Sequence, residues 1–231
     1  MKILIATVKS WNLKNVGKLI KKYKKHRFCL LSKKEQFTLD MVKEFKPDII
    51  FVPHWNWIIP KAIYSKYKTI IFHMTDLPFG RGGSPLQNLL SRGIYTTQIS
   101  AIKCVKNLDA GPVYCKEEFN LHFGSAQEIL TEMSNIIFDK MIPYIIEKNP
   151  KPQPQKGKVT EFKRRKPKES NVRQLKELVQ MYDWIRMLDG EGYPPAYIET
   201  PNFRIEFTDA KIKHSEVIAK CRILKKKVKE Y

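Results

Sequence analysis

Three short apolar runs separated by two amphipathic stretches constrain the fold of this 231-residue chain more than any other feature. The runs cover residues 2–8, 28–31 and 48–52, and each is short enough to be a buried strand. The stretches between them, residues 13–25 and 36–45, carry apolar residues at helical spacing. Strands that alternate with helices over short connections form parallel sheets with helices on both faces. The sequence therefore predicts an α/β fold with a Rossmann-like, mostly parallel sheet.

The turn after the first run lacks the glycine pattern of dinucleotide-binding proteins. No G-x-G-x-x-G follows the run, so a dinucleotide site is not predicted. The turn instead contains Trp11 and Asn12. Ligands of α/β proteins bind at the carboxyl edge of the sheet, where this turn lies. We therefore predict that Trp11 and Asn12 contact a substrate.

Composition divides the chain into three parts. Residues 1–149 form the main predicted domain, which ends in a long helix from Ser125 to Glu147. Residues 150–157 begin Pro-Lys-Pro-Gln-Pro-Gln and are predicted to be a stiff linker. Residues 158–231 are predicted to form a small α+β appendage, with a helix from Val172 to Leu188 followed by two or three short strands.

The chain carries a large positive charge, with 43 Lys and Arg against 23 Asp and Glu, or +20 at pH 7. A charge of this size attracts anionic partners, among them nucleic acids. The excess is spread along the chain and is mostly lysine on predicted helix faces. We therefore interpret it as a lysine-rich composition rather than an RNA-binding surface.

The cysteines and the lengths of the apolar runs indicate the cellular compartment of the protein. The four cysteines include no C-x-x-C pair, which suits free thiols in a reducing cytoplasm, and no metal site is predicted. No apolar run approaches the roughly 18 residues of a membrane span. The first run has no small-residue cleavage site after it, so we interpret it as a strand rather than a signal peptide. A cytoplasmic protein without a membrane partner is expected.

A histidine and an aspartate are the strongest candidates for chemistry. His73 ends the apolar run 69–72 and precedes a loop rich in Gly and Pro, while Asp109 lies in a later turn. Alone, His73 would more often be a core histidine and Asp109 a turn former. A carboxylate beside an imidazole orients the ring, and the two together make a usable acid–base pair. We predict that they meet at the carboxyl edge of the sheet.

The neighbouring residues leave alternatives open. Arg81 suits either an anion or structural packing, and Trp55 and Trp57 suit either a slot for a ring or the core. Gly80, Gly82 and Gly83 permit the backbone to approach a flat ligand closely, although a loop alone also needs glycine.

Two runs of sequence make the family resemblance specific. The chain resembles the folate-dependent formyltransferase family in His73-x-x-x-Leu77-Pro78-x-x-Arg81-Gly82-x-x-Pro85 and in Leu108-Asp109-x-Gly111. That family includes formyltransferases that act on methionyl-tRNA, on glycinamide ribonucleotide and on sugars. The resemblance covers most of residues 1–150. Residues 162–167 and 185–194 are similar to the tails of sugar formyltransferases, so the chain most resembles nucleotide-sugar N-formyltransferases of the pseudaminic-acid type.

The resemblance implies a formyltransferase fold, a reaction and its participants. The formyl donor would be N10-formyltetrahydrofolate, and the acceptor the amine of a nucleotide-linked deoxyamino sugar. His73 would stabilise or protonate the oxyanion, and Asp109 would orient the imidazole. The implied donor-binding residues are Trp57, Ile58, Ile59, Leu77, Pro78, Arg81, Gly82 and Leu108. Substrate-binding residues are expected to be Trp11, Asn12 and Thr75.

One position departs from the family pattern. Most members carry an asparagine two residues before the histidine, and this chain has Ile71 there. Loss of one oxyanion donor typically lowers a rate by ~10²–10³, so we expect a replacement. Asn56, counted with the catalytic residues, and Thr75 are the candidates.

Two other functions remain as alternatives. A methionyl-tRNA formyltransferase-like enzyme would suit the charge, but the resemblance to that enzyme includes a larger carboxyl-terminal barrel, for which the region after Pro154 is short. A non-catalytic basic binding protein is the other alternative, favoured by Ile71 and opposed by His73 and Asp109. A homodimer is compatible with the sequence.

Overall fold

The computed structural model describes residues 1–226. These residues belong to two compact units, each assembled from three segments of the chain. Unit 1 comprises Met1–Gly82, Thr97–Phe119 and Leu130–Glu161, and unit 2 comprises Gly83–Thr96, Asn120–Ile129 and the described residues from Phe162 onward. Residues 150–157, which we expected to be a linker, lie inside unit 1.

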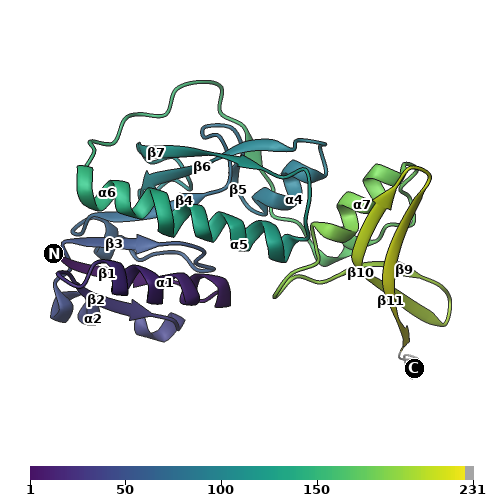
Figure 1. The fold of residues 1–231 in the computed structure, drawn as a ribbon, viewed down its shortest axis with the longest axis horizontal. Coiled ribbons are helices and arrows are strands. Elements are labelled where there is room, and N and C mark those ends of the chain that lie inside the picture. The colour runs from purple at the N-terminus through teal and green to yellow at the C-terminus, as the bar shows by residue number, and fades with distance from the viewer. Residues whose placement is uncertain (227–231) are drawn as a thin grey trace. The chain divides into compact units, whose positions relative to one another are not determined.

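A six-stranded sheet forms the centre of unit 1, in the order β2-β1-β3-β4-β6-β7 (Figure 1). Its strands are β1 (Lys2–Ala6), β2 (Arg27–Leu31), β3 (Ile49–Val52), β4 (Thr69–His73), β6 (Thr96–Lys103) and β7 (Val113–Asn120). The pairs β1–β2, β1–β3 and β3–β4 are parallel, and β4–β6 is antiparallel. The prediction of a mostly parallel sheet is confirmed.

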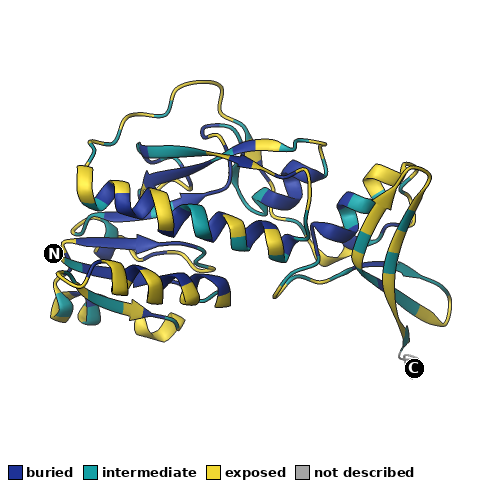
Figure 2. Ribbon diagram, viewed as in Figure 1, coloured by how far each residue is buried: buried dark blue, intermediate teal, exposed yellow. Residues whose placement is uncertain are grey.

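Helices cover both faces of this sheet. Leu4 and Ala6 of β1 pack in one cluster with Val42 of α2 (Leu39–Phe45) and Ile63 of α3 (Lys61–Tyr64). Side chains alternate along a strand, so Ile3 and Ile5 face the opposite side. Helix α1 (Ser10–Lys22) lies on that side, next to the long helix that begins at Ala126. The sheet is buried between these helices and the helices on its other face (Figure 2).

The long helix expected from Ser125 to Glu147 is present but contains one wide turn. It consists of α5 (Ala126–Ile136), the π-helical turn η2 (Ile137–Met141) and α6 (Ile142–Lys148). The Ile142 N–H donates to the Ile137 carbonyl, five residues back. Pro143 follows directly and has no N–H to donate, which accounts for the break in the regular ladder at this point.

The second predicted helix begins later than expected. Residues 34–36 form the 3₁₀ turn η1 (Lys34–Gln36), and α2 starts only at Leu39. The Thr38 hydroxyl accepts a hydrogen bond of 3.2 Å from the Met41 N–H. Thr38 is thus an N-cap, the residue type that most often begins a helix.

Unit 2 combines short helices with an antiparallel sheet. The helices are α4 (Pro85–Leu90), the 3₁₀ turn η3 (Pro167–Ser170) and α7 (Leu178–Arg186), and the sheet has the order β11-β10-β9. Its strands are β9 (Ala196–Glu199), β10 (Phe203–Lys213) and β11 (Glu216–Lys225). The expected α+β appendage is present, but β10 and β11 form a long hairpin rather than short strands.

The helix predicted from Val172 to Leu188 is wrong in its first part. The Val172 N–H donates to the Tyr197 carbonyl at 2.9 Å, and Asn171 forms a β-bridge with the same residue. This pairing extends the sheet at β9, so the segment before Leu178 is not free to be helical. Apolar spacing alone does not distinguish the two outcomes.

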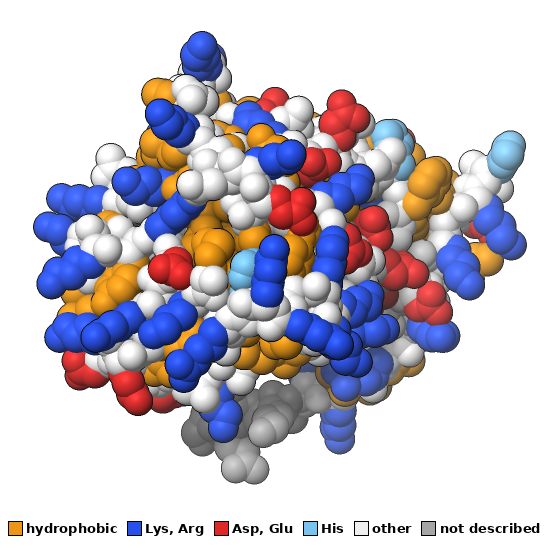
Figure 3. Space-filling view, turned by 60° about the vertical axis from the view of Figure 1, so that its left-hand side comes forward, with side chains coloured by type: hydrophobic (Ala, Val, Ile, Leu, Met, Phe, Trp, Pro, Cys, Tyr) orange, Lys and Arg blue, Asp and Glu red, His pale blue; other side chains and the backbone are white. Residues whose placement is uncertain are grey.

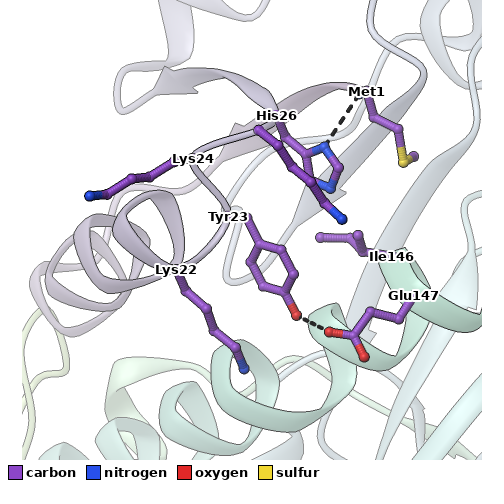
Figure 4. Close-up of a pocket in the computed structure, with 8 residues that line it drawn as sticks. Met1, Lys22, Tyr23, Lys24, His26, Ile146 and Glu147 are labelled. Atoms are coloured by element: carbon purple, nitrogen blue, oxygen red, sulfur yellow. Dashed lines mark hydrogen bonds between the residues drawn. The ribbon is translucent and has the colours of Figure 1, made fainter.

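A basic pocket lies at the amino edge of the unit 1 sheet (Figure 4). It is lined by Met1, Lys22, Tyr23, Lys24, Lys25, His26, Ile146 and Glu147. The Tyr23 hydroxyl donates to the Glu147 carboxylate, and burial, together with this carboxylate, raises the pKa of Tyr23 to about 12. Ligand sites of α/β sheets lie at the carboxyl edge, so the chemistry is to be sought at the other end of these strands.

Candidate active site

His73 is the last residue of β4 and is buried at the carboxyl edge of the sheet. Its Nε2 lies 2.8 Å from the Gly80 carbonyl oxygen, and its Nδ1 lies 3.5 Å from Asp109 Oδ2. A carbonyl and a carboxylate both accept hydrogen bonds. Because a carbonyl oxygen can only accept, the His73 Nε2–H donates to the Gly80 carbonyl in this structure. For Nε2–H to reach a substrate oxygen, it must leave Gly80.

Asp109 lies in the turn between β6 and β7, and it too is buried. Its backbone has φ = 50°, a left-handed conformation that aspartate tolerates better than most residues. Its Oδ2 accepts a 2.9 Å hydrogen bond from the Gly82 N–H. The same carboxylate oxygen thus faces His73 and the Gly-rich loop. The structure brings together the two residues predicted to form the pair.

Gly111 is required by close packing in the same turn. A Cβ atom at this position would lie 1.7 Å from the Lys103 carbonyl oxygen. That oxygen belongs to the end of β6, so it cannot move aside without disturbing the sheet. Only glycine permits this approach, which explains the spacing of the Leu108-Asp109-x-Gly111 run.

Polar contacts fix the start of the loop after His73. The Thr75 hydroxyl lies 3.4 Å from the Gly80 oxygen, and the Ser100 hydroxyl donates to the Thr75 carbonyl at 2.7 Å. The Lys116 ammonium donates to the Leu77 carbonyl at 2.7 Å and pairs with the Asp76 carboxylate. Thr75 is fully buried, so its side chain supports the loop in this structure.

Ile71, which stands where most family members carry an asparagine, lies in apolar surroundings. Ile71 lies two residues before His73 in β4 and therefore on the same face of the sheet. It packs against a buried cluster that includes Cys104 and Ile59. Asn56, one proposed substitute, is exposed in the loop after β3. The replacement donor remains a prediction.

Large apolar side chains are exposed in two turns at the carboxyl edge of the sheet. Ile58 is 93% exposed, Leu108 68% and Trp57 38%. The Trp57 ring packs edge-on against Trp55 at 5.0 Å between centroids. A flat, largely apolar ring system such as a pteridine would cover such surface, so these residues fit a folate ligand. Ile59 and Leu77, also expected to bind the donor, are buried in the core.

The residues after β1 are buried and incompletely hydrogen-bonded. Asn12 Nδ2 donates to the Thr7 hydroxyl at 2.8 Å and to the Pro53 carbonyl at 3.3 Å. Among the described residues, Trp11 Nε1 and Asn12 Oδ1 have no partner. The His54 ring packs against Trp11, and burial, helped by the nearby Lys9 ammonium, lowers the pKa of His54 to about 4.

Residues 1–226 contain neither a cluster of metal-binding side chains nor a membrane-spanning helix. This part of the chain has no group of three or more His, Cys, Asp or Glu residues that could hold a metal ion. Nor does it contain a helix of the length and apolarity that a bilayer crossing requires. Lys and Arg side chains cover much of the face shown in Figure 3, with fewer Asp and Glu among them.

Known proteins that match this chain include several methionyl-tRNA formyltransferases. The model of the methionyl-tRNA formyltransferase carboxyl-terminal domain matches residues 167–224. Methionyl-tRNA formyltransferase of Sulfurihydrogenibium is 31% identical over 191 residues, which are 78% of this chain and 60% of that protein. The solved methionyl-tRNA formyltransferase of Clostridium thermocellum is 47% identical, with a TM-score of 0.95, over 98% of this chain and 100% of that one.

The chain belongs to the methionyl-tRNA formyltransferase family. Membership confirms the predicted formyltransferase fold and the predicted class of enzyme, a formyltransferase that uses N10-formyltetrahydrofolate. It also shows that a carboxyl-terminal part of this size occurs in the family, because the Clostridium protein is matched over its whole length.

The prediction of a nucleotide-sugar formyltransferase, and of the pseudaminic-acid type in particular, is wrong. A sugar N-formyltransferase from Shewanella shares the fold at a TM-score of 0.68, over 87% of this chain and 93% of that one, but only 15% of its sequence. The family match instead covers residues 167–224, which include residues 185–194, one of the two stretches that we compared with sugar-enzyme tails. The short appendage, which we held against the tRNA enzymes, does not exclude them.

Gln155 is the residue at the site that sequence reasoning missed. Its side chain binds Arg81 and the carbonyls of Asp109 and Gly111. The Pro-rich composition around it predicted a stiff linker, and composition does not reveal which way a side chain points. The one available signal was a glutamine, whose side chain has four hydrogen-bonding positions, inside a segment expected to be a linker.

Proposed function

We propose that this chain transfers the formyl group of N10-formyltetrahydrofolate to the α-amino group of methionyl-tRNA. The full-length likeness to the Clostridium methionyl-tRNA formyltransferase carries this proposal. The His73–Asp109 pair supports it, since formyl transfer to an amine needs a group that stabilises an oxyanion and a group that manages protons.

Residues of unit 1 have separate roles in the proposed reaction. His73 donates a hydrogen bond from Nε2–H to the formyl oxygen after releasing the Gly80 carbonyl. Asp109 holds the ring from the Nδ1 side, and the Gly82 N–H holds Asp109. Trp57, Ile58 and Leu108 cover the folate ring. Formyltetrahydrofolate supplies the one-carbon group.

The acceptor contacts residues at the same edge of the sheet. Trp11 Nε1 and Asn12 Oδ1 are buried polar groups without partners among the described residues, so they suit a polar ligand group. The net charge of +20 suits a tRNA acceptor. The free thiols of the described cysteines suit a cytoplasmic reaction.

Formylation of methionyl-tRNA by the purified protein tests the proposal directly. The protein is incubated with N10-formyltetrahydrofolate and methionyl-tRNA, and the aminoacyl group is released and analysed for a gain of one formyl group by mass spectrometry. Uncharged tRNA and the His73→Ala variant are the controls. Formylmethionine from the wild type alone supports the proposal, and its absence with an intact fold rejects it.

The salt dependence of tRNA binding separates this function from a non-specific basic surface. Binding through phosphates weakens steeply as salt rises, whatever the RNA. We expect charged methionyl-tRNA to compete better than uncharged tRNA at a fixed salt concentration. Equal competition at every salt concentration would favour the alternative of a non-catalytic basic binding protein.

A further inference from the structure

The Gln155 side chain uses all of its hydrogen-bonding positions on two separate loops of unit 1. Its Oε1 accepts hydrogen bonds from Arg81 Nε at 3.1 Å and Arg81 Nη2 at 2.7 Å. Its Nε2 donates to the Asp109 carbonyl at 2.7 Å and to the Gly111 carbonyl at 2.8 Å. A primary amide has two donors and two acceptor positions, so this side chain is fully engaged.

The backbone on each side of Gln155 is also held in place. Gln153 exchanges two hydrogen bonds with Val113 of β7, of 2.7 and 2.8 Å. Further along, the Arg81 N–H donates to the Thr160 carbonyl at 2.9 Å, and the Thr160 N–H donates to the Pro78 carbonyl at 3.2 Å. Gln155 is therefore presented between β7 and the Gly-rich loop by a segment with little freedom.

The two loops that Gln155 joins each carry one half of the candidate site. Arg81 directly precedes Gly82, whose N–H holds the Asp109 carboxylate. Asp109 is thus held at its carboxylate by one loop and at its carbonyl by Gln155. Its left-handed backbone, at φ = 50°, costs free energy that such contacts offset.

We propose that Gln155 is a positioning residue that sets the distance between Asp109 and His73. The inference rests on the proposed formyl transfer, because positioning has a kinetic meaning only for that reaction. Gln155 touches neither ring nitrogen of His73, so it acts through Asp109 and through the loop that contains Arg81 and Gly82.

Gln155→Glu is the most informative substitution because it changes only the half of the contacts that the Gln155 Nε2 group makes. A carboxylate keeps the size of the side chain and keeps both acceptor positions for Arg81. It loses the two N–H donors and places negative oxygen against the Asp109 and Gly111 carbonyls. Gln155→Ala removes both halves. Gln153→Ala is the matched control, since within residues 1–226 the Gln153 side chain makes a single hydrogen bond, a long one of 3.5 Å to the Lys151 carbonyl.

Steady-state kinetics provide the first test. We expect Gln155→Glu and Gln155→Ala to lower kcat by about 10- to 100-fold, as loss of a group that orients a catalytic side chain does. KM for both substrates should change by less than about threefold, because uniform binding is not altered. Gln153→Ala should match the wild type. A wild-type kcat in Gln155→Glu, or a loss confined to KM, overturns the proposal.

A measurement without substrate keeps this test separate from the function itself. The ¹⁵N signals of the His73 imidazole are compared between the wild type and Gln155→Glu, with His73→Gln identifying the signals. We expect the His73 signals to move in Gln155→Glu and to stay unchanged in Gln153→Ala. Unchanged signals in Gln155→Glu overturn the positioning role even if the wild type forms no formylmethionine. An inactive wild type with moved signals instead rejects the proposed function alone.

Discussion

Replacing Gly111 by alanine tests how tightly the turn that carries Asp109 is packed. The added Cβ would lie 1.7 Å from the Lys103 carbonyl oxygen, whereas a Cβ atom essentially never comes within 3.0 Å of a heavy atom outside its own residue and that residue's chain neighbours. The two backbones must therefore separate by at least 1.3 Å, the difference between those distances. That separation disrupts two hydrogen bonds, from Gln155 Nε2 to the Gly111 carbonyl and from the Lys103 N–H to the Pro112 carbonyl.

The consequences for stability and for activity can be estimated separately. Two hydrogen bonds at about 1 kcal/mol each, together with residual strain, predict that the free energy of unfolding falls by about 2–3 kcal/mol. Asp109 is two residues away and would move with the turn. A misplacement of about 1 Å costs on the order of 10²-fold in rate, so kcat should fall by about that factor.

Urea unfolding and kcat for methionyl-tRNA formylation are the assays. Gly17→Ala is the control, because a Cβ at Gly17 in α1 meets no atom within 4 Å, and alanine in an exposed helix should raise stability by about 0.5–1 kcal/mol. A Gly111→Ala variant as stable and as active as the wild type would refute the packing argument.

Three further predictions concern other parts of the chain. Arg186 is buried in unit 2 and pairs with buried Asp183 at 2.7 Å. Because Arg186→Ala leaves the Asp183 carboxylate buried without its partner, it should lower the free energy of unfolding by about 3–5 kcal/mol in urea titrations. A loss below about 1 kcal/mol would contradict this prediction. Burial lowers the pKa of His54 to about 4, against about 6.5 when unfolded, so its contribution to stability is present above pH 6.5 and is lost as the pH falls toward 4. The full pKa difference corresponds to roughly 3 kcal/mol of unfolding free energy, which partial exposure of the ring reduces to about 1–2 kcal/mol. Asparagine tolerates the backbone φ of 51° at this position, so His54→Asn should remove this acid sensitivity. A parallel pH dependence of the unfolding free energy in the two proteins would contradict the prediction. Cys221 is exposed, whereas burial raises the pKa of Cys115 to about 12, so iodoacetamide should modify Cys221 of the native protein first. In a mass-spectrometric time course, Cys221→Ser should abolish this fast phase of modification. An undiminished fast phase would identify another thiol.

The sheet of unit 1 could be predicted because each strand is specified locally. Residues 3–6 and 49–52 are continuous apolar runs, and a strand buried on both faces requires such a run. His73 and Asp109 were predictable as a pair because His73 ends a strand and Asp109 lies in a turn, both at the edge where ligands bind.

Other features depend on contacts that are distant in sequence. Val172 pairs with Tyr197, and that pairing overrode an apolar pattern typical of a helix. Gln155 reaches Arg81 across 74 residues, and nothing in a Pro-rich run indicates that contact. The acceptor was mispredicted for a similar reason, since short motifs around residues 162–194 specify local structure and not the molecule bound.

Single-turnover formylation of methionyl-tRNA by the wild type, Asp109→Asn and His73→Ala tests the central claim most directly, because it isolates the chemical step from product release. We predict formylmethionine from the wild type, a rate lowered by at least about 10²-fold in Asp109→Asn, and no detectable product from a folded His73→Ala variant. Near-normal rates in either variant would contradict the assignment of the reaction to this imidazole and this carboxylate.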